Sequence, residues 1–157
     1  MQNSETKVRP DTPEMIRVKT LESEILSLAA VNGQVDSEQY TEVREKVRVF
    51  AQEAAISGNE DTLGLARHLV GMLQTQEENI RFDLLRHELT TLEEQVVTTD
   101  NDNISELSML SSKIYELIQK MERMSAERNM TAVLETARNL RAGVEERLQQ
   151  SLFSPSS

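Results

Sequence analysis

The sequence contains no cysteine and no tryptophan, and aromatic residues make up only 3% of it. Without cysteine the chain has no disulfide framework, no thiolate metal site and no cysteine nucleophile. With so few aromatic side chains, any core must be built from Leu, Ile, Val, Met and Ala. Hydrophobic residues make up 38% of the chain and charged residues 28%, a balance typical of packed amphipathic helices.

Proline is also scarce, and long apolar runs are absent. The three prolines lie near the ends of the chain, so nothing between Glu14 and Ser154 forbids a helix. No window approaches the roughly eighteen apolar residues of a membrane span, and residues 1–15 lack the apolar segment of a secretory signal. We therefore expect a cytoplasmic protein without a membrane span.

Positive charge is in short supply. The chain has 17 Lys and Arg against 27 Asp and Glu, which gives a net charge of −10. Nucleic-acid binding draws its affinity from basic side chains that neutralise phosphates, so the balance argues against a nucleic-acid partner. An anionic membrane surface is disfavoured for the same reason. A basic surface on another protein is a better match.

The apolar residues that are present recur at spacings of three and four, which is typical of amphipathic helices. Six such stripes follow one another along the chain. Their members are Val18, Leu21, Ile25 and Leu28; Tyr40, Val43, Val47, Phe50 and Ala54, continuing to Ile56; Leu63, Ala66, Leu69, Val70 and Leu73; Ile80, Leu85, Leu89, Leu92 and Val96; Leu107, Leu110, Ile114, Leu117, Met121 and Met124; and Val133, Ala137, Leu140, Val144 and Leu148.

Short polar segments between the stripes contain residues that begin and end helices. Thr12 followed by Pro13 predicts the start of the first helix, and Gly33 in "NGQ" predicts its left-handed C-cap. Asp36 predicts the start of the second helix, and Gly58 its end. Asn59 and Asn103 predict two further N-caps. Residues 74–79 are polar but contain no helix breaker, so we predict one long helix over about 60–98.

The stretches 60–73 and 131–144 share a pattern of Leu, Ala-Arg and Leu, and Leu63 corresponds to Leu134, an offset of 71 residues. The same offset pairs Val18 with Leu89, Leu21 with Leu92, Ile25 with Val96, Val43 with Ile114, Val47 with Ile118 and Phe50 with Met121. All three helices of one half thus map onto three helices of the other, which predicts a duplicated unit.

We therefore predict an all-α fold of two tandem three-helix antiparallel bundles. The expected organisation is a disordered tail at 1–11, unit 1 at 12–78, unit 2 at 79–150 and a disordered tail at 151–157. One unit alone is near the lower size limit for a stable core. The units therefore either support each other through a long shared helix at about 60–98 or dimerise through an apolar stripe.

Residues with metal-binding or catalytic chemistry do not fall into working patterns. "RHELTTLEE" at 86–94 lacks the second histidine of a metalloprotease helix. Asp100 and Asp102 resemble the start of a calcium loop, but Ser105 and Ser111 occupy its glycine and final glutamate positions. The five glycines are scattered, so no phosphate-binding loop is present. We expect no metal, no cofactor and no enzymatic activity.

Two segments of the first unit carry a family resemblance. "VDSEQYTEV" at 35–43 and "ARHLVGMLQ" at 66–74 are similar to helices two and three of the BAG domain, a three-helix bundle through which co-chaperones bind the ATPase domain of the seventy-kilodalton heat-shock chaperone. The second segment has Arg67, Val70, Leu73 and Gln74 at a spacing that resembles helix three of that family. The sequence departs from the family at Ala66, where the first basic residue would stand.

The resemblance implies a chaperone contact made by Glu42, Glu45, Arg67 and Gln74. The acidic residues would meet basic groups on the ATPase lobe, and binding would open the nucleotide cleft and hasten ADP release. At the offset of 71, the second unit keeps Arg138 in the place of Arg67 but has Glu145 in the place of Gln74.

Two other families share the helical periodicity. Spectrin-like repeats also have a continuous helix between consecutive three-helix units, and the GAT domain, which binds ubiquitin and GTPases, is similar to 85–150. The alternative to an adaptor is a structural role, as a helical spacer or as a scaffold whose apolar stripes pair with copies of itself in a homo-oligomer.

Overall fold

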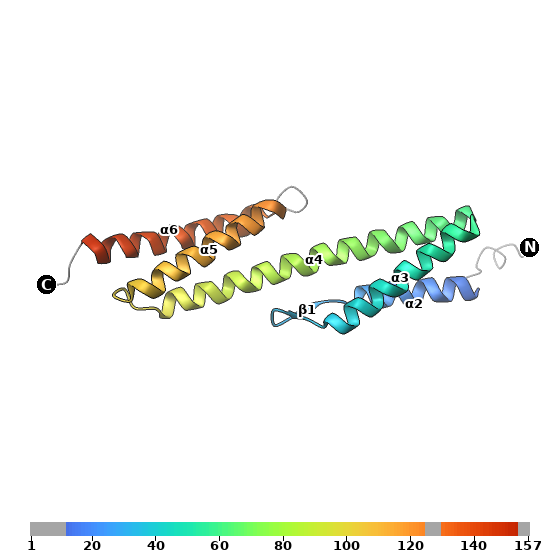
Figure 1. The fold of residues 1–157 in the computed structure, drawn as a ribbon, viewed down its shortest axis with the longest axis horizontal. Helices are drawn as coiled ribbons and strands as arrows, with labels where there is room; N and C mark the ends of the chain where they lie inside the picture. Colours follow the sequence, from blue (N-terminus) through green and yellow to red (C-terminus); the bar gives the residue numbers. More distant parts are fainter. Residues whose placement is uncertain (1–11, 125–129, 154–157) are drawn as a thin grey trace, which may run out of the picture. The chain divides into compact units, whose positions relative to one another are not determined.

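The computed structural model describes residues 12–124 and 130–153. Figure 1 shows the order of the elements, which are α2 (Pro13–Leu26), β1 (Ala30–Val31), β2 (Gln34–Val35), α3 (Ser37–Ser57), α4 (Glu60–Thr98), α5 (Ile104–Met124) and α6 (Thr131–Phe153). The predicted all-α class is confirmed, and so is the single helix through residues 74–79. The tail predicted at 1–11 lies outside the described residues, as do residues 154–157 of the tail predicted at 151–157. Residues 151–153 belong to α6, so that part of the prediction is wrong.

The chain divides into two compact units, at residues 1–82 and 83–157. The first contains α2, the β1–β2 hairpin, α3 and residues 60–82 of α4. The second contains residues 83–98 of α4 together with α5 and α6. The sequence-based division between 78 and 79 falls four residues before the structural one.

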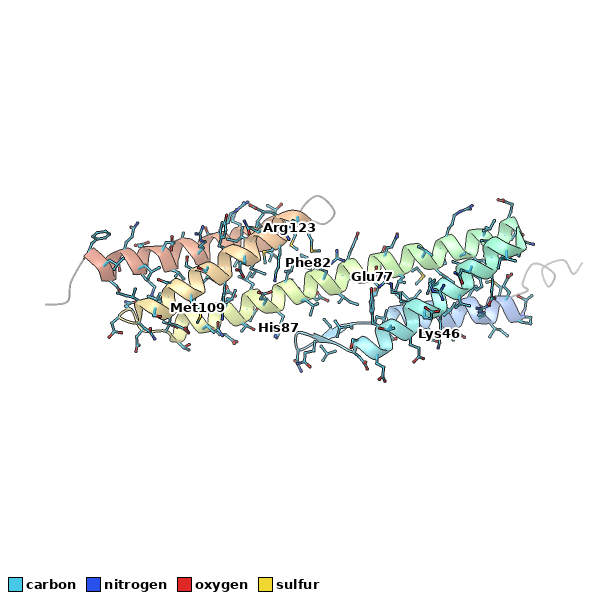
Figure 2. All side chains as sticks on the ribbon, in the orientation of Figure 1. Lys46, Glu77, Phe82, His87, Met109 and Arg123 are labelled. Carbon is cyan, nitrogen blue, oxygen red and sulfur yellow. The ribbon has the colours of Figure 1, made fainter. Side chains whose placement is uncertain are left out.

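The core of the first unit is formed by the apolar stripes of its three helical segments. The buried side chains are Val18, Leu21, Ile25, Leu28, Val43, Val47, Phe50, Ala54, Ala66, Leu69, Leu73 and Ile80. Polar contacts tie the segments together at the surface: Arg17 pairs with Glu53 at 2.6 Å, and Lys46, which Figure 2 labels, pairs with Glu24 at 3.0 Å, linking α2 to α3.

Ile56 does not belong to the buried stripe of α3, because its side chain is 86% exposed. It follows the buried Ala54 by only two positions, which turns it away from the core by more than half a helical turn. The stripe of α3 therefore ends at Ala54, and the prediction that it reaches Ile56 is wrong.

The first helix also ends earlier than the sequence predicted. It stops at Leu26, and Ala30 pairs with Val35 in a two-stranded antiparallel hairpin. Asn32 (φ 53°) and Gly33 (φ 77°) form its two-residue turn. Two consecutive positive φ angles are what a type I′ hairpin turn requires, and Asn-Gly is the pair that best tolerates them. Gly33 thus has the predicted left-handed conformation, but in a hairpin rather than at a helix end.

The other predicted helix boundaries are confirmed. Thr12 Oγ1 accepts a hydrogen bond from the Met15 amide at 3.1 Å, and Asp36 Oδ1 accepts from the amides of Glu38 and Gln39. The remaining N-caps are Asn59, which accepts from Asp61 and Thr62, and Asn103, which accepts from Glu106. Gly58 ends α3 with φ 68°.

The core of the second unit is centred on α5. Its buried apolar side chains are Leu85, Leu89, Leu92, Val96, Leu107, Leu110, Ile114, Leu117, Ile118, Met121, Met124, Met130, Leu134, Ala137 and Val144. The stripe predicted for α5 is buried throughout. At one end of the unit, Arg147 of α6 donates a hydrogen bond at 2.8 Å to the carbonyl of Val96 and a second to the carbonyl of Thr99.

Candidate functional site

A groove runs between α3 and the first part of α4, within the first unit. It is lined by Thr41, Arg44, Glu45, Val47, Arg48 and Ala51 from α3 and by Val70, Leu73, Gln74 and Glu77 from α4. The groove contains two of the residues that the sequence pointed to, Glu45 and Gln74. We name it the α3–α4 groove.

The floor of the α3–α4 groove is apolar because each helix turns the edge of its buried stripe toward it. Val47 is 3% and Leu73 is 7% exposed, so both belong to the core as well as to the floor. Ala51 has a small side chain and leaves room that a larger residue would fill. An apolar floor with a charged rim is the usual composition of a surface that binds another protein.

Charged side chains of α3 form one rim of the groove. Arg48 Nε donates to Glu45 Oε1 at 2.9 Å, and a second nitrogen of its guanidinium contacts the other carboxylate oxygen. This hydrogen bonding lowers the pKa of Glu45 and raises the pKa of Arg48. Both side chains are more than half exposed, so the pair contributes little to folding stability. It places two opposite charges next to each other on the rim.

Tyr40 and Glu77 join α3 to α4 beside the groove, and Figure 2 labels Glu77. The Tyr40 hydroxyl donates a hydrogen bond to Glu77 Oε2. Burial raises the pKa of Tyr40, and the hydrogen bond and negative charge of Glu77 raise it further. The phenol therefore keeps its proton and remains a donor. This contact links the two helices where the groove begins.

The structure brings together only part of the predicted contact surface. Glu42 lies on α3 outside the groove lining and pairs with Lys46 at 3.3 Å. Arg67 lies on α4 and borders a different hollow, with Leu26. Arg138 belongs to the second unit, where it pairs with Glu122 at 2.8 Å.

Sequence reasoning did not single out Arg44, Arg48 or Glu77 as site residues. A signal for the two arginines is present, because each directly follows a buried valine of the α3 stripe, Val43 and Val47. A residue one position beyond a buried one lies at the border between core and solvent. Glu77 carries no such signal, since its role depends on Tyr40 of a different helix.

Within 12–124 and 130–153, no group of three or more His, Asp or Glu side chains is arranged to hold a metal ion. No helix in these ranges combines the length and the apolar character needed to cross a membrane. The chain matches no protein-family model, no curated protein and no solved structure.

Proposed function

We propose that this chain is a non-enzymatic protein-interaction module, in which a BAG-like first unit binds the ATPase domain of the seventy-kilodalton heat-shock chaperone through the α3–α4 groove. The observation that carries this proposal is the meeting of Glu45 and Gln74 in one groove. These residues come from the second and third helices of the unit, the two helices on which the family resemblance rests.

The proposal includes a tandem of two three-helix units. It is supported by burial at the offset of 71. Eight pairs are buried in both halves: Val18 and Leu89, Leu21 and Leu92, Ile25 and Val96, Val43 and Ile114, Val47 and Ile118, Phe50 and Met121, Ala66 and Ala137, and Leu73 and Val144. In the pairs Leu63 and Leu134, and Leu69 and Leu140, one member is half-buried. The first residues of α4 and α6, Glu60 and Thr131, are also separated by this offset.

In the proposed complex the groove floor covers an apolar patch of the ATPase domain, and the rim supplies the charges. Glu45 pairs with a basic group of the partner, and so does Glu42, which lies three residues earlier on α3. Gln74 and Arg67 lie seven positions apart on α4 and so face the same side of that helix. They hydrogen-bond to the polar edge of the same lobe. Holding the lobe in this way opens the nucleotide cleft and speeds ADP release.

The test is a titration of the full chain against the ATPase domain loaded with labelled ADP. The proposal predicts faster ADP release with increasing chain concentration. It also predicts at least a tenfold loss of apparent affinity in the double variant Arg67→Ala/Gln74→Ala, because both side chains contact the lobe.

The matched control is Gln149→Ala, which removes an exposed glutamine from α6 in the second unit and is expected to leave ADP release as in the unmodified chain. Circular dichroism melts establish that all variants fold. Absence of binding at tens of micromolar, or equal losses in the double variant and the control, would contradict the proposal.

Self-assembly is the second candidate function, and one observation favours it. Large apolar side chains are exposed in both units: Ile56 is 86%, Val97 is 81% and Phe153 is 80% exposed. A scaffold built from copies of this chain would bury such residues. Sedimentation equilibrium separates the candidates, since a monomer at all concentrations argues against a scaffold and a stable oligomer argues against an adaptor that acts as a monomer.

A further inference from the structure

A second groove lies between α5 and α6, within the second unit. Six of its eight lining residues occupy, at the offset of 71, positions that line the α3–α4 groove. The corresponding pairs are Arg44 and Tyr115, Val47 and Ile118, Arg48 and Gln119, Ala51 and Glu122, Val70 and Arg141, and Gln74 and Glu145. Only the Val47 and Ile118 pair keeps its apolar character with little change, so the two grooves are equivalent in place and different in chemistry.

Both carboxylates of the α5–α6 groove have partners within the unit. Arg138 donates to Glu122 Oε2 at 2.8 Å, and Ser111 donates to Glu145 Oε2 at 2.9 Å. Ser111 is itself buried, at 6% exposure, so Glu145 is held toward α5. Neither carboxylate is paired with Arg141.

Arg141 is the cation of this groove that the described residues leave without a counterion. Its guanidinium carbon lies 4.7 Å from the centroid of the Tyr115 ring. Across residues 12–124 and 130–153 it makes no ion pair, and its buried Nε has no hydrogen-bond partner. A guanidinium held against an aromatic face has already lost much of its side-chain freedom, so pairing with a carboxylate costs less entropy than for a free arginine.

We propose that the α5–α6 groove is a second protein-binding site, which takes an amphipathic helix of a partner protein and pairs one Asp or Glu carboxylate of that helix with Arg141. The exposed Ala142 and the edge of the largely buried Ile118 supply the apolar contact in the groove. A carboxylate matches the planar guanidinium through two parallel hydrogen bonds. The site does not depend on the chaperone proposal, which uses the first unit.

The charges around Arg141 favour a single carboxylate over a phosphate. Glu122 and Glu145 lie in the same groove, and the whole chain carries a net charge of −10. A dianionic phosphate would meet one unpaired cation and two neighbouring carboxylates, whereas one carboxylate neutralises Arg141 without excess negative charge. A helix that carries the acidic side chain can also place its apolar side chains against the apolar groove residues, which a free phosphate ion cannot do.

The first experiment selects from a displayed library of amphipathic helical peptides, with the full chain as bait and its Arg141→Gln variant as the counter-selection. Peptides retained by the unmodified chain alone are expected to carry Asp or Glu at one fixed position next to their apolar stripe. Enrichment without an acidic position, or no enrichment at all, overturns the proposal.

The second experiment measures the affinity of one selected peptide by fluorescence anisotropy. Changing its acidic residue to Gln or Asn is expected to weaken binding at least tenfold, and the same loss is expected for Arg141→Gln with the original peptide. Combining both changes should produce no further loss, because each removes the same ion pair.

Lys113→Gln is the matched control, since it removes one positive charge from an exposed position of α5 that does not line the groove. It is expected to leave the affinity unchanged. The affinity of Arg141→Lys should lie between that of the unmodified chain and that of Arg141→Gln, because a lysine keeps the charge and loses the planar stack on the tyrosine ring. If Lys113→Gln and Arg141→Gln weakened the affinity equally, the loss would follow from net charge alone, and the proposed site would be wrong. ADP release by the chaperone domain stays unchanged in Arg141→Gln, which separates the two proposals.

Discussion

Gly58 and Gly64 lie six residues apart and differ in what their backbones require. Gly58 ends α3 with φ 68°, a conformation that a residue with a Cβ rarely adopts, whereas Gly64 lies inside α4. No atom lies within 4 Å of a Cβ built at either position. Backbone conformation alone therefore decides the effect of adding a methyl group.

We predict that Gly58→Ala destabilises the protein by roughly 1–2 kcal/mol, the cost of a left-handed alanine. Gly64→Ala is expected to stabilise it by about 0.5–1 kcal/mol, because alanine favours helix and restricts the unfolded chain. Urea unfolding followed by circular dichroism measures both. Destabilisation by Gly64→Ala would show that the open space beside it is not available to a methyl group.

Single residues that act on their own backbone could be predicted from the sequence. Thr12, Asp36, Asn59 and Asn103 cap helices as expected, since an N-cap needs only its own side chain and the next three amides. The Arg141 contact with Tyr115 was not predictable in this way. It depends on how α5 packs against α6, which no local pattern encodes.

At the scale of the elements, the contact between Tyr40 and Glu77 links α3 to α4 and is sensitive to pH. Burial and Glu77 raise the pKa of Tyr40 in the folded state, whereas a tyrosine of the unfolded chain ionises near pH 10. The stabilisation from this contact is therefore fully present below about pH 10 and is lost as the pH rises through the higher folded-state pKa.

We predict that Tyr40 titrates above pH 10 in a Tyr115→Phe background, which leaves it as the single tyrosine. The near-ultraviolet absorbance of tyrosinate follows the titration. Adding Glu77→Gln should lower the midpoint without abolishing the shift, because burial is its largest cause. Glu94→Gln makes the same charge change in the second unit and should leave the midpoint in place. A midpoint at or below 10 in the Tyr115→Phe protein would show that neither the burial of Tyr40 nor its contact with Glu77 persists in solution.

Among the elements, the long α4 helix could be predicted because residues 74–79 contain no breaker. The hairpin at 30–35 could have been predicted as well, since Asn-Gly is the strongest short-range hairpin signal. The apolar stripe of α2 ends at Leu28, which is buried at 1% exposure although it lies beyond the helix. Because Leu28 follows Ile25 by three positions, the helical spacing of apolar residues extends into a segment that is not helical.

At the scale of the whole molecule, the two units have separate sets of buried side chains. A cavity created in the core of one unit should therefore destabilise that unit and leave the other folded. Ile114 is fully buried in α5, so Ile114→Ala is expected to cost about 2–5 kcal/mol. We predict faster amide hydrogen exchange in α5, α6 and residues 83–98 of α4, with unchanged exchange in α2 and α3.

Hydrogen-exchange mass spectrometry, resolved to individual peptides, measures the exchange rate in each helix. Ile56→Ala is the control, because its side chain is 86% exposed and surface truncations usually stay within about 0.5 kcal/mol. Faster exchange in α2 and α3 of the Ile114→Ala protein would show that the two units unfold as one.

The contacts of Arg147 with the end of α4 can form only late in the synthesis of the chain. At the end of α4 the hydroxyls of Thr98 and Thr99 donate to the carbonyls of Glu94 and Gln95. Arg147 of α6 adds hydrogen bonds to the carbonyl of Val96 and to that of Thr99, the residue after the helix. Protein domains begin to fold from the N-terminal side during synthesis. The first unit is complete once residue 82 has been made, whereas the contact of Arg147 with the end of α4 must wait for a residue translated 49 codons after Thr98. Until then Leu85, Leu89 and Leu92 lack the covering that α5 and α6 later provide, so the nascent chain presents an apolar helix to its surroundings for the time the ribosome needs to reach Arg147.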